Sequence, residues 1–308
     1  MASTGGTMFD GFDSRGAIAL ARRASVAAIA SLAAAVILAG CGGTAQAGGD
    51  APTGGPGFPV ALDRGVDGDI WGLGGSTAVE IDDTGRVERR IDLDFLPSPW
   101  TITAVSVGTD DRLFLSAVWS DGDAFGDIVA YDVATEEHTV RAHQEGPVGD
   151  LTEVGDDIVF ISFAADDESS FTVRRANPTG EIADLAVLPG DGRRAAIDAD
   201  PAGTVVVTTA AGLTRLSTTG TTLEEWPLPA DAADLAVSRE GRMLATTRDG
   251  ASCVDWFRVD ATGPVPLDGP CDAAGFVWLD EQTVLVSTGD ENGAGLVQMA
   301  AHSSPSGR

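Results

Sequence analysis

The sequence predicts an all-β protein, a β-propeller of six four-stranded blades preceded by an export signal. Three observations predict this fold: a strand–turn–strand unit recurs six times, a Thr-Gly turn follows most copies, and the copies are evenly spaced. Counted between equivalent positions at the start of the second strand, the spacings are 43, 45, 47, 38 and 41 residues. Four short strands in about 40–45 residues is the period of a propeller blade.

Each unit consists of an alternating strand, a polar turn and an apolar strand. The six copies occupy residues 59–73, 104–115, 151–161, 196–207, 235–246 and 276–286. The Thr-Gly turns end at Gly85, Gly180, Gly220 and Gly263, whereas the second copy has Glu136 at this place. Glycine suits such a turn because it adopts positive φ at little steric cost. A β-sandwich is the alternative, but a sandwich need not repeat one unit at a constant period.

The ends of the repeat region leave the closure of the ring open. The last copy reaches Met299 and runs into residues 303–308, which we expect to be a disordered tail. Residues 58–62 could form an N-terminal strand that completes the last blade, and an irregular seven-bladed ring is the alternative count. We expect six blades within a propeller domain at residues 58–302.

The N-terminal segment has the three regions of an export signal. A charged region ends at Arg22-Arg23, an uncharged Ala-rich run follows, and Leu38-Ala39-Gly40-Cys41 resembles the lipobox of bacterial lipoproteins. The alternative interpretation of this segment is a retained membrane-spanning helix, but the uncharged run is at the lower length limit for such a helix. The resemblance implies a signal peptide at residues 1–40, and acylation of Cys41 with palmitate or a similar chain. The partner implied is the lipid bilayer, at the extracytoplasmic face of the cell membrane.

Residues 41–57 are rich in glycine and contain little that could enter a core, so we expect a flexible tether.

Besides Cys41, the chain has only two cysteines, Cys253 and Cys271. An even pair in an oxidising compartment usually forms a disulfide. Two free thiols are the alternative, and a metal site has little support because no His lies near either cysteine.

The composition argues against nucleic-acid binding. The chain has no lysine, and its 19 arginines face 47 acidic residues, for a formal net charge of −28. Such a surface repels the phosphate backbone of DNA and RNA. We therefore expect no nucleic-acid partner.

Catalytic motifs are mostly missing. The chain has three histidines, and His138 and His143 fall near the outer strand of the second blade while His302 falls in the tail. It has no Gly-x-Ser-x-Gly elbow, and no P-loop is possible without lysine. Paired carboxylates such as Asp110-Asp111 fit turn positions. We assign no catalytic residue and favour a non-enzymatic protein, although channel-facing carboxylates could still serve a hydrolase or lyase.

The candidate binding face lies on the second blade, whose loop between its second and third strands is longer than its counterparts. Loop insertions on one face of a repeat array often mark the binding face. Aromatic residues among carboxylates could hold a sugar or a basic peptide segment, and local packing of each ring is the alternative. The predicted residues are Trp100, Trp119, Asp121, Asp123, Phe125 and Asp127. We expect no cofactor and no metal, and calcium at the three aspartates is the alternative left open.

On its lipobox and its repeats, the chain resembles extracytoplasmic propeller lipoproteins with NHL-like or YncE-like repeats. The resemblance covers residues 58–302 and rests on periodicity, with no diagnostic motif. It implies a protein that binds proteins, glycans or peptides, while a minority of such families are hydrolases, lyases or quinone-dependent dehydrogenases. The function we expect is a membrane-anchored module that binds or scaffolds an envelope protein or a cell-wall glycan.

Overall fold

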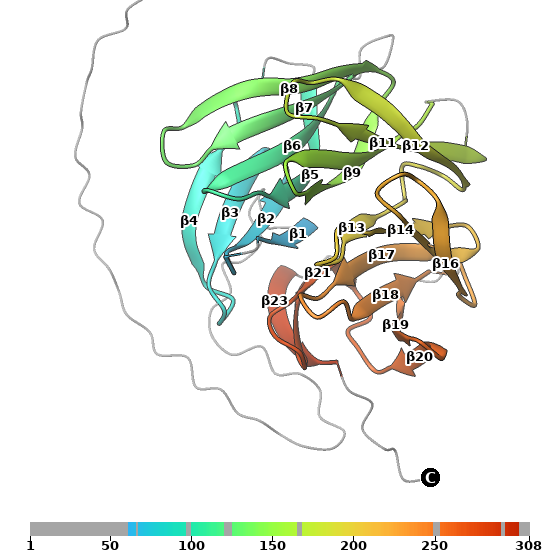
Figure 1. The fold of residues 1–308 in the computed structure, drawn as a ribbon. Coiled ribbons are helices and arrows are strands. Elements are labelled where there is room, and N and C mark those ends of the chain that lie inside the picture. The colour runs from blue at the N-terminus through green and yellow to red at the C-terminus, as the bar shows by residue number, and fades with distance from the viewer. Residues whose placement is uncertain are drawn as a thin grey trace, which may run out of the picture. The chain divides into compact units, whose positions relative to one another are not determined.

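The computed structural model describes residues 61–65, 67–96, 100–119, 125–164, 168–248, 253–290 and 293–301 (Figure 1). The predicted signal peptide, Cys41, the tether and the C-terminal tail lie outside the described residues. None of the described residues forms a helix long and apolar enough to cross a membrane.

The described chain folds into six antiparallel sheets, the blades of a propeller, which confirms the predicted fold class. Within each blade, strands adjacent in sequence are hydrogen-bonded neighbours. Blade 1 contains β1 (Ala61–Arg64), β2 (Ile70–Gly74), β3 (Thr77–Ile81) and β4 (Val87–Asp92), and blade 2 contains β5 (Trp100–Val107), β6 (Arg112–Trp119), β7 (Phe125–Asp132) and β8 (Glu137–Glu145). Blade 3 contains β9 (Val148–Val154), β10 (Asp157–Ser162), β11 (Ser170–Ala176) and β12 (Ile182–Pro189). Blade 4 contains β13 (Ile197–Ala199), β14 (Val205–Thr209), β15 (Gly212–Leu216) and β16 (Thr222–Pro227). Blade 5 contains β17 (Ala232–Val237), β18 (Met243–Thr247), β19 (Asp255–Asp260) and β20 (Gly263–Leu267), and blade 6 contains β21 (Ala273–Trp278), β22 (Thr283–Asp290) and β23 (Gly293–Ala300).

The core of the propeller is divided among the six contacts between blades. One apolar cluster fills each contact, and the strands β2, β14 and β18 are buried along their whole length. Both faces of a blade are covered by its neighbours, so these strands are continuously apolar rather than alternating. This arrangement explains why runs such as Val205-Val206-Val207 recur in the sequence.

The ring closes by side-chain contacts between blades 1 and 6, whose strands lie side by side in Figure 1. Ile70 and Ile81 of blade 1 pack with Val277 and Leu285 of blade 6. The alternative in which residues 58–62 complete the last blade is wrong for residues 61–62, the part that the structure describes, because β1 is the inner strand of blade 1. Leu62 pairs with Gly72 of β2, within the same blade.

The predicted Thr-Gly turns join the third and fourth strands. In blade 1, Asp82 Oδ1 accepts hydrogen bonds from the backbone N–H of Thr84 and of Arg86, and Gly85 has φ +85°. Blade 2 has no glycine here, and Glu136 adopts φ +60° instead. This left-handed conformation is unfavourable for a residue with a Cβ atom.

Successive strands of a blade run in opposite directions, so all six inner strands begin on one face of the ring. We call this the upper face, and it also carries the loops between second and third strands. The lower face carries the turns between first and second strands and those between third and fourth strands. This division places Trp100, Trp119 and Phe125 of blade 2 at the upper face.

Candidate functional site

The inner strands surround a central channel with a volume of about 1980 Å³. Four of them contribute a carboxylate to its wall: Asp63 on β1, Asp150 on β9, Asp198 on β13 and Asp234 on β17. Each of these residues is only partly exposed. The prediction of channel-facing carboxylates was made without naming residues. The available signal was an aspartate within an apolar inner strand, as in Ile197-Asp198-Ala199.

Two of these carboxylates bridge neighbouring blades in the same way. Asp63 Oδ1 accepts a hydrogen bond from the backbone N–H of Arg64 at 2.7 Å, and its Oδ2 accepts one from Val107 of blade 2 at 2.6 Å. Asp198 Oδ2 likewise accepts from Val237 of blade 5 at 2.6 Å. These carboxylates therefore connect inner strands whose backbones are not paired with each other.

Asp150 on β9 makes the same kind of bridge, from blade 3 to blade 4, at a position nearer the upper face. Its Oδ1 accepts from the Leu151 N–H at 3.0 Å, and its Oδ2 accepts from Ile197 of blade 4 at 2.9 Å. Asp234 accepts from its neighbour Leu235 at 2.8 Å. Backbone hydrogen bonds of this kind stabilise the charged form but do not compensate for the hydration lost in the channel wall.

Burial raises the pKa of all four carboxyls above the ordinary value. The pKa of Asp150 rises to about 7 and that of Asp234 to about 8, in both cases mainly because of desolvation. The pKa of Asp63 is raised by desolvation, and that of Asp198 is raised well above its usual value by desolvation and then by the charge of Asp63. The channel thus holds carboxyl groups that can carry a proton near neutral pH.

Two arginines lie at the lower end of the channel. Arg239 of blade 5 donates from Nη2 to the carbonyl of Gly65 in blade 1 at 2.9 Å, so it reaches past blade 6. Arg64 donates from Nη1 to the carbonyl of Trp278 in blade 6 at 2.9 Å. Burial and the nearby charge of Arg239 lower the pKa of Arg64. These contacts join blades 1, 5 and 6 at the place where the ring closes.

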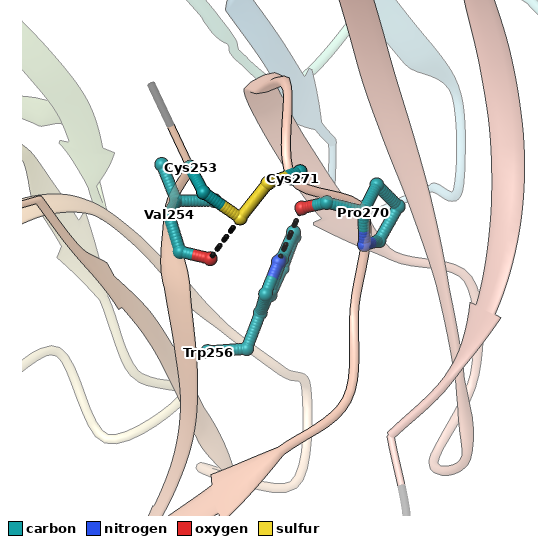
Figure 2. Close-up of a disulfide and its surroundings, with 5 residues drawn as sticks. All are labelled: Cys253, Val254, Trp256, Pro270 and Cys271. Carbon is teal, nitrogen blue, oxygen red and sulfur yellow. Dashed lines mark hydrogen bonds between the residues drawn. A yellow bond between two sulfur atoms is a disulfide. The ribbon is translucent and has the colours of Figure 1, made fainter. Parts of the chain in front are cut away.

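The predicted disulfide joins Cys253 to Cys271 at the upper end of the channel, with the Cα atoms 4.3 Å apart (Figure 2). It connects the segment before β19 to the segment that enters blade 6. Beside it, the Trp256 indole N–H donates to the carbonyl of Pro270 at 2.8 Å (Figure 2). A Cβ atom on Gly269 would lie 2.5 Å from the Trp256 ring, so the chain passes directly over the indole only because this residue is glycine.

Three predicted aromatic residues form a row across the upper end of blade 2. Trp100 is paired with Trp119 across β5 and β6, and Trp119 is paired with Phe125 across β6 and β7. The two tryptophan rings meet edge to face, with centroids 5.5 Å apart and planes at 76°. Trp100 also packs against the cluster between blades 1 and 2, yet all three residues remain partly exposed. The two tryptophan side chains are therefore packed against each other and still partly exposed.

Asp127 follows Phe125 by two residues on β7, so its side chain lies on the same side of the sheet and nearer the lower face. Its Oδ1 lies 2.5 Å from Nδ1 of His143 on β8, and the His143 ring stacks on Phe125 with centroids 5.7 Å apart. The imidazole side chain is 60% exposed and the carboxylate 12%, so Asp127 orients a histidine that faces solvent. Asp121 and Asp123 lie outside the described residues.

Sequence reasoning did not include His143 and Glu145 among the binding residues. Both lie on β8, where Glu145 pairs with Phe125 and His143 with Asp127. We define the aromatic ledge as the surface formed by the following residues: Trp100, Trp119, Phe125, Asp127, His143 and Glu145. Alternation along β8 could have indicated these two, because residues two apart share one side of a strand.

Among the described residues, the hairpin of blade 1 beside the aromatic ledge is shorter than that of blade 2. The last pair of the β2–β3 hairpin, Gly74 with Thr77, corresponds to Ala117 with Asp127 in blade 2. Blade 2 continues for two more pairs, ending with Trp119 and Phe125. At the turn of blade 1, a Cβ atom on Gly75 would have no atom of the described residues within 4 Å.

No group of three or more His, Cys, Asp or Glu that could hold a metal ion occurs among residues the structure describes. Of the three aspartates considered for calcium, only Asp127 is described, and its carboxylate is engaged by His143.

His138 stacks on Phe95 with centroids 4.1 Å apart. Both described histidines thus lie on the outer strand β8, as predicted.

No protein-family model and no curated protein sequence matches this chain. Solved structures with similar folds include a streptogramin B lyase, at 15% identity and a TM-score of 0.54, covering 82% of this chain and 86% of that one. TolB from Acinetobacter baumannii is 15% identical with a TM-score of 0.58, covering 73% of this chain and 57% of its own. The PQQ-bound aldose sugar dehydrogenase of Streptomyces coelicolor is 11% identical with a TM-score of 0.54, covering 80% and 95%. At these identities the likeness concerns the β-propeller fold, which these proteins of varied function share with this chain.

Proposed function

We propose that the chain is a membrane-anchored, extracytoplasmic β-propeller that binds or scaffolds an envelope protein or a cell-wall glycan. The observation that supports this function best is the aromatic ledge, where three large aromatic side chains stay partly exposed on a rigid sheet. Aromatic residues on rigid elements often dominate the energetics of recognition, because they bury a large area at small entropic loss.

The proposed anchor is the acylated Cys41, which would hold the propeller at the extracytoplasmic face of the cell membrane. Two acyl chains anchor a protein stably, whereas one gives only marginal binding. Cys41→Ala should move the chain from the membrane fraction to the soluble fraction and abolish incorporation of a labelled fatty acid. A chain that keeps its membrane association and its label after this change would contradict the anchor.

The binding role is tested by affinity capture from an envelope extract with the full-length, tagged chain. Trp100→Ala and Trp119→Ala should each reduce recovery of a captured protein or glycan. Leu223→Ala is the matched control, since Leu223 is 50% exposed on the outer strand of blade 4. Equal recovery with all three variants, or no partner with the wild-type chain, would count against the proposal.

A second candidate function is a hydrolase or lyase that uses the channel carboxylates. The observation in its favour is that the pKa of Asp150 and of Asp234 is raised to about 7 and about 8, as suits a general acid near neutral pH. Against it, the carboxylates of Asp63, Asp150 and Asp198 accept backbone hydrogen bonds from two blades. Release of soluble fragments from cell-wall material by the wild-type chain, abolished in Asp150→Asn and in Asp234→Asn, would support this function.

A further inference from the structure

We infer that the aromatic ledge binds the cationic side chains of a basic peptide segment, such as an Arg- or Lys-containing stretch of an envelope protein. This inference rests on the proposed binding function and specifies its ligand. It follows from the charge of the ledge, the arrangement of its rings and their partial exposure.

The charge of the ledge favours a cation. Its ionisable groups are Asp127, His143 and Glu145, and Glu145 is exposed at the end of β8. The turn of blade 1 beneath it, residues 74–77, carries no charged side chain. By the same formal count that gives the chain a net charge of −28, the two carboxylates give the ledge a charge of −2. An anionic ligand would therefore meet repulsion, whereas an ammonium or guanidinium group would be attracted.

The ring geometry favours a compact cation over a stacked sugar. Trp100 and Trp119 stand at 76° to each other, so the row does not offer one continuous flat platform. Phe125 has one side occupied by the imidazole of His143 at an interplanar angle of 24°. A sugar chain stacks best on coplanar rings, whereas a cation needs only one accessible aromatic face within about 6 Å.

The carboxylates complement these rings. Glu145 is paired directly with Phe125, and Asp127 lies on the same side one alternation away. An ammonium group on the Phe125 side of the row would thus meet an aromatic surface and a carboxylate together. Cation–π contacts of this kind are strengthened when the cation also finds an anionic partner.

The test measures binding of a fluorescein-labelled octapeptide of alternating Lys and Ser to the purified full-length chain in detergent, by fluorescence anisotropy. Trp100→Leu and Phe125→Leu remove a ring while keeping apolar bulk, and each should weaken binding by about five- to tenfold. Glu145→Gln should weaken binding by about threefold. The matched control Glu137→Gln lies exposed at the opposite end of β8 and should leave binding unchanged. Thermal unfolding of each variant establishes that it is folded, and Glu145→Gln keeps the test valid if a ring variant does not fold.

Three outcomes would overturn the inference. The first is the absence of peptide binding by the wild-type chain. The second is equal weakening by Glu137→Gln and Glu145→Gln with no effect of the ring variants, which would indicate only general attraction to an acidic surface. The third is that the wild-type chain binds a neutral N-acetylglucosamine hexamer more tightly than the peptide, and that the ring variants lose this binding to the hexamer. This third result would preserve the proposed binding function and assign the ledge to glycans.

Discussion

Replacing Asp234 by Asn should stabilise the propeller at neutral pH. The carboxyl has a pKa of about 8 in the folded chain against an ordinary value of 3.8, and burial is the main cause. At pH 7 the folded chain therefore keeps a proton that the unfolded chain releases. Over the roughly 3 pH units between 3.8 and 7, this difference destabilises the fold by about 4 kcal/mol at about 1.4 kcal/mol per unit. Asp234 is partly exposed rather than fully buried, which lowers the desolvation cost and reduces the expected gain to about 2 kcal/mol.

The sign of this effect depends on pH. Because the folded pKa is raised, the contribution of Asp234 is most favourable below pH 3.8 and is lost as the pH rises toward 8. Asparagine does not titrate, and its Oδ1 can still accept the hydrogen bond from the Leu235 N–H. The gain in unfolding free energy should therefore be less than about 1 kcal/mol at pH 4 and increase up to pH 8.

Urea unfolding of the full chain, followed by tryptophan fluorescence at pH 4, 6 and 8, measures this gain. Asp231→Asn is the matched control, because Asp231 is exposed three residues away and should change stability by less than about 0.5 kcal/mol at any pH. An Asp234→Asn chain that is equally stable or less stable than wild type at pH 8 would refute the reasoning. So would a gain that is the same at pH 4 and pH 8.

Four further substitutions test the turns and the disulfide, with thermal or urea unfolding as the measurement. Gly220→Ala should destabilise by about 2–4 kcal/mol, because a Cβ would lie 2.0 Å from the carbonyl oxygen of Leu185. Gly263→Ala, with no atom within 4 Å of the added Cβ, should lose only about 1 kcal/mol, and equal losses would contradict the steric argument. Glu136→Gly should stabilise by up to about 1 kcal/mol by relieving the positive φ of a residue with a side chain, and a loss would show that the strain is absent. Cys253→Ser should lower stability by about 3 kcal/mol, the chain-entropy value for this loop, and an unchanged midpoint would mean that the disulfide does not constrain the unfolded chain.

The blade pattern could be predicted because it is local. Each blade is an antiparallel meander of consecutive strands, so its period and its turns are written in neighbouring residues. The Thr-Gly turn at Gly85 follows from hydrogen bonds within five residues of chain, from Asp82 to Arg86. Ring closure could not be read in this way, because Arg64 and Trp278 are 214 residues apart.

The candidate site was predicted in part for the same reason. The long loop predicted between the second and third strands of blade 2 pointed to Trp119 and Phe125, whereas the structure places both residues in strands. The pairing of β5, β6 and β7 brings them into one row with Trp100. The contribution of β8 was missed because alternation shows only that His143 and Glu145 share one side of the strand, whereas the bulge in the pairing of β8 with β7 decides which side that is. His143 and Glu145 are placed by that register.

The sequence by itself determined the propeller class, the number of blades, the glycine turns and the two cysteines that pair. These features depend on short-range repetition and on backbone preferences of single residues. Only the tertiary structure decided that Asp150 and Asp234 lie in the channel wall with raised pKa values, and that Phe125 stays partly exposed beside the shorter hairpin of blade 1. The physical reason is that burial and exposure in a ring depend on the neighbouring blade, whose length and register are set about 40 residues away in the chain.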